Sequence, residues 1–473
     1  MRSLALLALL TALPTAAALD LKPCRLPGLD REARCGTHEV FENRAAAAGR
    51  RIALRVVVIP ASGTPAAPDP VLYFEGGPGG SAVDSGPGLT EELPEALRHR
   101  DLVLIDIRGI HTLRCPRTEE AALETFMDPA TVRSCRETLA RDHDLAQYTT
   151  EAIVDDADEV RAALGYGKVN LLGASYGARA ALVYLRRHPD SVRTVHLHSV
   201  LPVDARVPMH LAPHTQAAFE RMAAACAAEP ACRAAFPDTK ADLETVLKRL
   251  EAGPANVPVR DESQKTQTLR LSRLSRNAAA QTVRYLLYRP AGARTLPLLR
   301  RRAAAGDFEP LAETAWDIAS AMLTSSPGGL YLSVTCAEDV AFVDAAEAAR
   351  LAVGTFMGDL RVRQQAAACA EWPSAKVPAS FLEPVRSSVP VLIYSGENDP
   401  ATPREWTERV AQTLPGSRIL TVPGGSHVFY GLTGVECLDR VYSDFLDRGT
   451  AEGLDIETCR KSIRPLPFLT SFE

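Results

Sequence analysis

The segment Val169-Asn170-Leu171-Leu172-Gly173-Ala174-Ser175-Tyr176-Gly177 joins a short apolar run to a Gly-x-Ser-x-Gly motif, and residues 176–187 then carry apolar side chains at helical spacing. A serine on so tight a strand-to-helix turn needs small neighbours, which accounts for glycine on both sides. The turn lifts the serine hydroxyl clear of a sheet and leaves it at a helix N-terminus, where negative charge is favoured. The motif is common by itself, but in this context it predicts that Ser175 is a nucleophile.

Other short apolar, β-branched runs predict the remaining strands of a sheet. They cover residues 52–59, 71–74, 102–106, 194–197, 391–394 and 418–422, in addition to 169–173. Helical patterns at 151–164 and 176–187 lie between some of them. Strands that alternate with helices predict an α/β protein with a mostly parallel sheet and helices on both faces.

The middle of the chain has a different pattern. Residues 202–384 are rich in Ala, Arg and Leu at helical spacing, with predicted helices at 209–225, 241–252, 277–287 and 303–322. We interpret this segment as a helical cap inserted between strands 6 and 7 of the fold. The core would then consist of residues 19–201 and 385–473.

A serine hydroxyl needs a base, and the base needs an acid that orients it. His427 ends the Gly-rich stretch Val422-Pro423-Gly424-Gly425-Ser426-His427, directly after the last predicted strand. Asp399 follows the strand at 391–394, with Glu397 as the alternative acid. The order Ser175, Asp399, His427 is the order of α/β-hydrolases, so we predict an α/β-hydrolase fold with this catalytic triad.

The oxyanion of an acyl-transfer intermediate needs backbone donors. We assign one to the N–H of Tyr176 and the other to Gly77, in the loop Glu75-Gly76-Gly77-Pro78-Gly79-Gly80-Ser81. Pro78 has no N–H to donate. A phosphate-binding loop is the alternative interpretation, but the chain lacks the P-loop and dinucleotide-binding spacings.

Three motifs together resemble the proline iminopeptidase and tripeptidyl aminopeptidase family of α/β-hydrolases. They are Gly76-Gly77-Pro78-Gly79-Gly80, Asp106-Ile107-Arg108-Gly109 and Gly173-Ala174-Ser175-Tyr176-Gly177. Cys336-Ala337-Glu338-Asp339 and the C-terminal stretch through Asp399 and His427 are similar to the tripeptidyl aminopeptidase branch. The resemblance covers most of the chain and is weakest in the cap.

The resemblance implies a serine exopeptidase that acts without metal or cofactor on a peptide with a free N-terminus. A carboxylate recognises an ammonium well, and by analogy with the cap residues of related enzymes the candidates are Glu338 and Asp339; the alternative for both is helix capping or solvation. One departure affects substrate preference: after Gly109 the chain reads Ile110-His111-Thr112-Leu113, where relatives usually have Thr-Gly-x-Ser. A carboxylesterase with the same triad and a non-catalytic binding protein are the competing functions.

The N-terminus predicts export. Arg2, an apolar run at residues 3–13 and the small residues Thr15-Ala16-Ala17-Ala18 have the layout of a cleaved signal peptide, residues 1–18. We therefore expect a periplasmic or secreted protein whose mature form does not span a membrane.

The cysteines agree with export, because an even number suggests disulfides in an oxidising compartment. Their spacing forms five local couples, so we expect neighbours to pair, although sequence alone leaves the connectivity open. The chain has no CxxC pair, which argues against a zinc site. The ten are Cys24, Cys35, Cys115, Cys135, Cys226, Cys232, Cys336, Cys369, Cys437 and Cys459.

The charge balance argues against nucleic acid as a partner. The chain of 473 residues has a formal net charge of −5, without the basic surplus that phosphate binding needs. The sequence does not indicate an oligomeric state.

Overall fold

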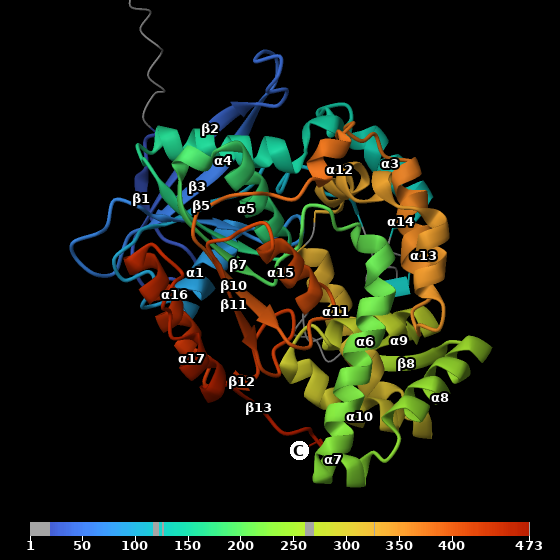
Figure 1. Cartoon of the computed structure of the whole chain (residues 1–473). Coiled ribbons are helices and arrows are strands. Elements are labelled where there is room, and N and C mark those ends of the chain that lie inside the picture. The colour runs from blue at the N-terminus through green and yellow to red at the C-terminus, as the bar shows by residue number, and fades with distance from the viewer. Residues whose placement is uncertain (1–18, 117–122, 125–126, 261–268, 326, 473) are drawn as a thin grey trace, which may run out of the picture.

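The computed structural model describes residues 19–116, 123–124, 127–260, 269–325 and 327–472. The predicted signal peptide, residues 1–18, lies outside them. Figure 1 shows a central sheet with helices on both faces and a separate group of helices to one side.

The sheet has nine strands in the order β1-β2-β3-β5-β4-β6-β7-β10-β11. From β5 to β11 every neighbouring pair is parallel, whereas β1, β2 and β3 join the sheet in antiparallel pairs. The bounds are β1 Lys22–Cys24, β2 Ala33–Phe41, β3 Arg51–Ile59, β4 Val71–Phe74, β5 Leu102–Ile105, β6 Val169–Ala174, β7 Val192–His198, β10 Val391–Gly396 and β11 Ser417–Val422.

All seven predicted strands are present, and the mostly parallel sheet is confirmed. β1 and β2 were not predicted. β2 lies near the edge of the sheet and buries only Ala33 and Val40, so its sequence has no continuous apolar run.

Two apolar layers sandwich the sheet. Val56 and Val58 of β3 pack in one cluster with α4 (Thr150–Ala163) and α5 (Tyr176–Arg187). Val57 and Ile59 point the other way, into a cluster with α1 (Ala82–Glu92), α16 (Glu436–Arg448) and α17 (Ile456–Ser462). Alternate residues of one strand thus bury opposite faces, as strand geometry requires. α15 (Arg404–Ala411) completes the first layer.

A long, mainly helical insertion connects β7 to β10, which are adjacent in the sheet. Five of the predicted strands precede the insertion and β1 and β2 add two more, so the insertion follows the seventh strand of the sheet in chain order. Its helices are α6 Val207–Ala228, α7 Pro230–Ala235, α8 Thr239–Ala252, α9 Arg276–Leu286, α10 Pro290–Ala305, α11 Glu309–Ser325, α12 Gly328–Glu338, α13 Ala345–Ala352 and α14 Leu360–Ala370.

The insertion has its own apolar core, which includes Leu247, Val283, Leu296 and Trp316. The helix predicted at 303–322 is divided in the structure: α10 ends at Ala305, Gly306 at φ +104° caps it in the left-handed region, and α11 begins at Glu309. A hairpin of β8 (Ala255–Arg260) and β9 (Leu269–Leu274) was also not predicted.

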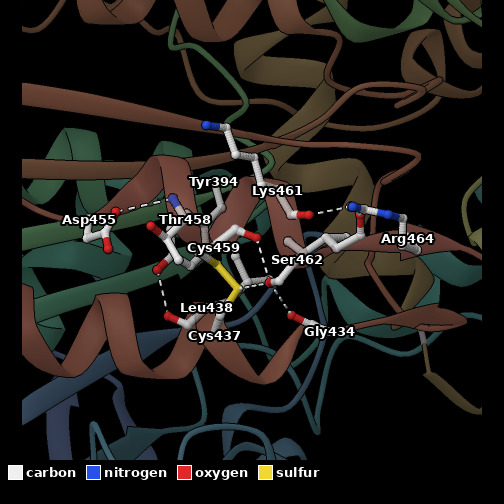
Figure 2. The surroundings of a disulfide bond; sticks show 11 residues. Tyr394, Gly434, Cys437, Leu438, Asp455, Thr458, Cys459, Lys461, Ser462 and Arg464 are labelled. Carbon is white, nitrogen blue, oxygen red and sulfur yellow. Dashed lines mark hydrogen bonds between the residues drawn. A yellow bond between two sulfur atoms is a disulfide. The ribbon is translucent and has the colours of Figure 1, made fainter.

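Five disulfides join the cysteines in neighbouring couples. Figure 2 shows the bond between Cys437 and Cys459, which ties α16 to α17. The other pairs are Cys24–Cys35, Cys115–Cys135, Cys226–Cys232 and Cys336–Cys369. Such a set fits an extracellular or secreted protein. Among the described residues, no helix combines the length and apolar character that a bilayer crossing requires.

Candidate active site

Ser175 lies on a strained turn between β6 and α5. Its φ is +56° with ψ −117°, a conformation that L-residues rarely adopt. The two flanking glycines make the turn possible. A Cβ on Gly177 would lie 1.9 Å from the carbonyl oxygen of Phe74, and one on Gly173 would lie 2.3 Å from that of Gly177. The geometry is that of a nucleophile elbow.

The imidazole of His427 is held by Asp399. Nδ1 of His427 lies 2.9 Å from Oδ2 and 3.1 Å from Oδ1 of Asp399, and the carboxylate is fully buried. Oδ1 also accepts from the N–H groups of Ala401 and Thr402 at 2.7 and 2.9 Å, and Oδ2 accepts from the Thr402 hydroxyl at 2.7 Å.

These contacts keep Asp399 ionised. Burial acts to raise its pKa, but the imidazole of His427 and the hydrogen bonds from Thr402 outweigh burial, so the pKa lies below its usual value. A permanently charged carboxylate stabilises the imidazolium that forms when a base accepts a proton.

The alternative acid, Glu397, has a different role in the structure. Its side chain is exposed, and Oε2 accepts the backbone N–H of Gly424 at 2.8 Å. It therefore supports the loop that leads to His427 and does not contact the imidazole.

Ser175 and His427 line one cavity of about 1180 Å³. The walls come from both the sheet and the insertion, since α6, α9, α11, α12 and α14 contribute residues. The His427 loop is fixed on several sides. Its carbonyl accepts the Ser199 hydroxyl at 2.8 Å, and the N–H of Val428 donates to the carbonyl of Tyr288, just after α9, at 3.1 Å.

The glycine loop after β4 passes directly beside Ser175. A Cβ on Gly76 would lie 3.4 Å from the Cβ of Ser175. Gly77 has φ +125°, and a side chain there would meet the N of Gly79 at 2.5 Å. Both Gly77 and Tyr176 line the cavity. Their positions suit backbone donors, and Tyr176 begins α5, where N–H groups have no acceptor within the helix.

The two predicted substrate carboxylates are buried and have internal partners. Glu338 accepts the N–H and the hydroxyl of Thr150, each at 2.6 Å, and it does not line the cavity. Asp339 borders the cavity but pairs with Arg179 at 3.0 Å. Burial raises the pKa of Glu338 to about 7, partly offset by the Thr150 bonds.

The Asp-x-Arg-Gly motif has a structural role. Arg108 is buried and forms a bidentate pair with Asp156, with both bonds at 2.7 Å. Asp106 accepts the Ser81 hydroxyl at 2.6 Å at the start of α1, and His111 lies 2.7 Å from its other oxygen. His111 lies in the stretch where this sequence differs from its relatives. It thus supports the base of the glycine loop and does not line the cavity.

The other histidines near the site pack as expected from their strand. His196 stacks on Tyr442 and His198 on Phe429, with ring centroids 4.5 and 4.3 Å apart. Burial lowers their pKa values to about 3 and about 4. In the described part of the chain, no group of three or more His, Cys, Asp or Glu side chains is arranged to hold a metal ion.

Sequence reasoning missed three residues of the site. Thr402 supports Asp399, and its position three residues further on is a common turn pattern that could have identified it. Tyr288 lies edge-on to His427, with ring centroids 5.0 Å apart, and Arg284 lines the cavity beside it. Neither carries a local signal, because Arg284 lies within an ordinary helical pattern and Tyr288 directly follows it.

A family model described as alpha/beta hydrolase fold matches residues 69–432. The chain belongs to this family, as its sheet and elbow require. It is also similar to named relatives. It is 27% identical to the tripeptidyl aminopeptidase of Streptomyces coelicolor, over 95% of this chain and 87% of the relative. Serine protease Hip1 of Mycobacterium tuberculosis is 26% identical to this chain, over 91% of this chain and 89% of the relative. The proline iminopeptidase of Neisseria gonorrhoeae is 30% identical over 28% of this chain and 32% of its own length.

Proposed function

We propose that this protein is an exported serine peptidase that removes N-terminal residues or short peptides from peptide substrates. The observation that carries the proposal is a buried, ionised Asp399 holding the His427 imidazole at 2.9 Å, in the cavity that Ser175 enters from a nucleophile elbow. The relatives that match nearly the whole chain are named as a serine protease and a tripeptidyl aminopeptidase. Export is supported by the five disulfides and by the signal pattern of residues 1–18.

The mechanism follows from the roles of these groups. Nε2 of His427 takes the proton of the Ser175 hydroxyl as Oγ attacks the scissile carbonyl. The N–H groups of Gly77 and Tyr176 stabilise the oxyanion of the tetrahedral intermediate. His427 then gives the proton to the leaving amine, which leaves an acyl-enzyme on Ser175. Water, deprotonated by His427, hydrolyses the ester and restores the serine.

We also propose that residues 202–384 form the cap and residues 19–201 and 385–473 the catalytic core. The insertion has its own apolar core, and its residues Leu211, Met322 and Tyr331 line the cavity. A peptide that reaches Ser175 must therefore fit between the cap and the sheet. Such an enclosure suits a chain end better than the middle of a folded protein.

Recognition of the free ammonium is better supported at Glu75 and Glu92 than at Glu338 and Asp339. Both Glu75 and Glu92 line the cavity, and Glu75 directly precedes the glycine loop. Partial desolvation in the cavity and then the charges of Glu75 and Glu91 raise the pKa of Glu92, although its side chain is exposed, and these carboxylates therefore repel one another. An arriving ammonium would relieve that repulsion, whereas Asp339 is already neutralised by Arg179 and Glu338 does not line the cavity.

The test compares free-amine peptides, their N-acetylated forms and a simple acetate ester, with product masses read directly. We expect cleavage of the free-amine peptides, little cleavage of the acetylated ones, and no activity or fluorophosphonate labelling in Ser175→Ala. Glu92→Gln should reduce peptide hydrolysis more than ester hydrolysis, while Glu95→Gln, at an exposed position that does not line the cavity, should have a small effect. Equal cleavage of free and acetylated substrates would overturn the aminopeptidase assignment in favour of an esterase.

A further inference from the structure

Arg284 is a buried cation that the proposed catalytic mechanism does not use. It lies on α9, is 6% exposed, and lines the same cavity as Ser175 and His427. Arginine keeps its charge at any pH a protein experiences. A buried charge is strongly destabilising unless it is paired.

Within the described residues, no carboxylate lies within salt-bridge distance of Arg284. Its Nη2 donates to the hydroxyl of Tyr288, its Nη1 reaches Oε1 of Gln281 at 3.5 Å, and its Nε has no hydrogen-bond partner. The guanidinium carbon also lies 4.8 and 5.0 Å from the ring centroids of Tyr285 and Tyr288. Neutral partners thus surround the charge without neutralising it.

Other buried arginines of this chain either pair with a carboxylate or lie away from the cavity. Arg108 pairs with Asp156, and Arg179 pairs with Asp339. Arg300 has no carboxylate bonded to it and its Nη2 lacks a partner, but it donates to the backbone carbonyls of Leu296 and Thr239, stacks on Phe219 and does not line the cavity. Arg284 differs from all three because its unsatisfied guanidinium borders an open space that a substrate can enter.

The segment that carries Arg284 is attached to the catalytic histidine loop. The hydroxyl of Ser426 donates to the carbonyl of Leu287, and the N–H of Val428 donates to that of Tyr288, so bonds from both sides of His427 reach this segment. Tyr288 lies between Arg284 and His427, since its ring contacts His427 and its hydroxyl accepts a hydrogen bond from Arg284. A group bound at Arg284 is therefore one aromatic side chain away from His427.

We propose that Arg284 binds a carboxylate of the substrate and so makes the enzyme selective for peptides that bring a negative charge to this side of the cavity. Arg361 of α14, which donates to the Tyr331 hydroxyl at 3.0 Å, lines the same cavity and adds a further cationic side chain to its wall. The proposal rests on the proposed peptidase function and names its substrate class. The carboxylate is either an acidic side chain or the free C-terminus of a short peptide.

The experiment measures kcat/KM for two matched pairs of free-amine peptides. In the first pair, one peptide has Glu and the other Gln at the same position, and the comparison is repeated for each position of the peptide. In the second pair, the C-terminus is either free or amidated. We expect wild type to prefer the carboxylate member of one pair by roughly tenfold to a hundredfold, as for a desolvated charge pair. Which pair shows the preference identifies the source of the carboxylate.

Variants then assign the preference to one side chain. Arg284→Met should abolish it, so that both members of the pair react at similar rates, and Arg284→Lys should retain part of it. Arg289→Gln is the matched control, because Arg289 lines the cavity but is exposed, and the preference should survive there. Fluorophosphonate labelling reports that each variant is folded and active. Should Arg284→Met not fold, inhibition of wild type by a product peptide and by its amide gives the same comparison.

Two results would overturn the inference. The first is that wild type shows no preference in either pair, and the second is that Arg284→Met keeps the wild-type preference. Failure of the proposed function looks different: no peptide is cleaved although fluorophosphonate labels Ser175. In that event aryl esters with and without a terminal carboxylate still test Arg284, and equal rates for both esters would reject it.

Discussion

The carboxylate of Glu338 accepts both the backbone N–H and the side-chain hydroxyl of Thr150, each at 2.6 Å, although 188 residues separate the two. This pair closes the N-terminus of α4 with an acidic group from α12. The Thr150 hydroxyl also lies 2.8 Å from that of Tyr176, whose N–H is a proposed oxyanion donor. Glu338 therefore acts on the site through packing, without facing the cavity.

This geometry predicts a stability effect for Glu338→Gln. The pKa of Glu338 is raised to about 7 in the folded protein, against roughly 4.3 in an unfolded chain. The folded state thus binds the proton more tightly, and wild-type stability falls as pH rises from about 4.5 to 7. Gln cannot titrate, so its unfolding free energy relative to wild type should increase between pH 5 and pH 8 by up to about 3 kcal/mol.

Chemical denaturation at pH 5 and pH 8 measures this difference. The amide can accept the Thr150 N–H and donate to the Thr150 hydroxyl, so we expect Glu338→Gln to fold and to keep the ratio of peptide to ester hydrolysis. A selective loss of peptide hydrolysis would instead support the sequence interpretation, in which Glu338 reads the substrate ammonium.

The elbow glycines give a second prediction. Gly177→Ala should prevent the native turn, because the new Cβ would lie 1.9 Å from the carbonyl oxygen of Phe74, a backbone atom that cannot move aside. We expect poor folding or a loss of at least roughly 3 kcal/mol of stability together with activity. Thermal unfolding and ester hydrolysis report both. Gly167→Ala, where nothing lies within 4 Å of the added Cβ, should behave like wild type.

Local patterns predicted much of the fold because apolar runs and turns are local properties. β4 and α5 have the predicted bounds, and the elbow between β6 and α5 was identified from five residues. The errors also have local causes. Gly306 interrupts a helix where the apolar spacing continues, and β2 is half-exposed, so neither feature changes the hydrophobic pattern enough to be recognised.

The site was less accessible from sequence, because its electrostatics depend on distant partners. The positions of Ser175 and His427 on one cavity follow from chain order and strand ends. Glu338 bonds to Thr150, 188 residues away, and Asp339 bonds to Arg179, 160 residues away. No spacing rule in the sequence reveals such pairs. That Arg284 has no carboxylate partner among the described residues is likewise visible only when all its neighbours are known.

The disulfides give a third prediction. Protein purified from the exported fraction should contain no alkylatable thiol under denaturing, non-reducing conditions, since all ten cysteines are paired. Peptide mapping should recover Cys336 linked to Cys369, the pair with the largest separation, 33 residues. Replacing both by Ala should lower stability by about 3 to 4 kcal/mol on the loop-entropy model. Several free thiols in the native protein would contradict the pairing.

The last prediction separates the two acids that follow β10. Asp399→Asn keeps the shape of the side chain but removes the charge that stabilises the imidazolium, and the amide can present an N–H to Nδ1 of His427 in place of an acceptor. Either change leaves His427 in the wrong state to take the proton of Ser175. We expect kcat to fall by roughly three to four orders of magnitude, with KM changed little.

Glu397→Gln is the matched control for this substitution. Glu397 lies two residues before Asp399 and loses the same charge, but it is exposed and accepts only the N–H of Gly424 in the His427 loop, a bond that Gln can also accept. Its kcat should stay within about threefold of wild type. Because ester hydrolysis uses the same base, both substrate types must respond alike in each variant. A small effect of Asp399→Asn beside a large effect of Glu397→Gln would show that the catalytic acid has been misassigned.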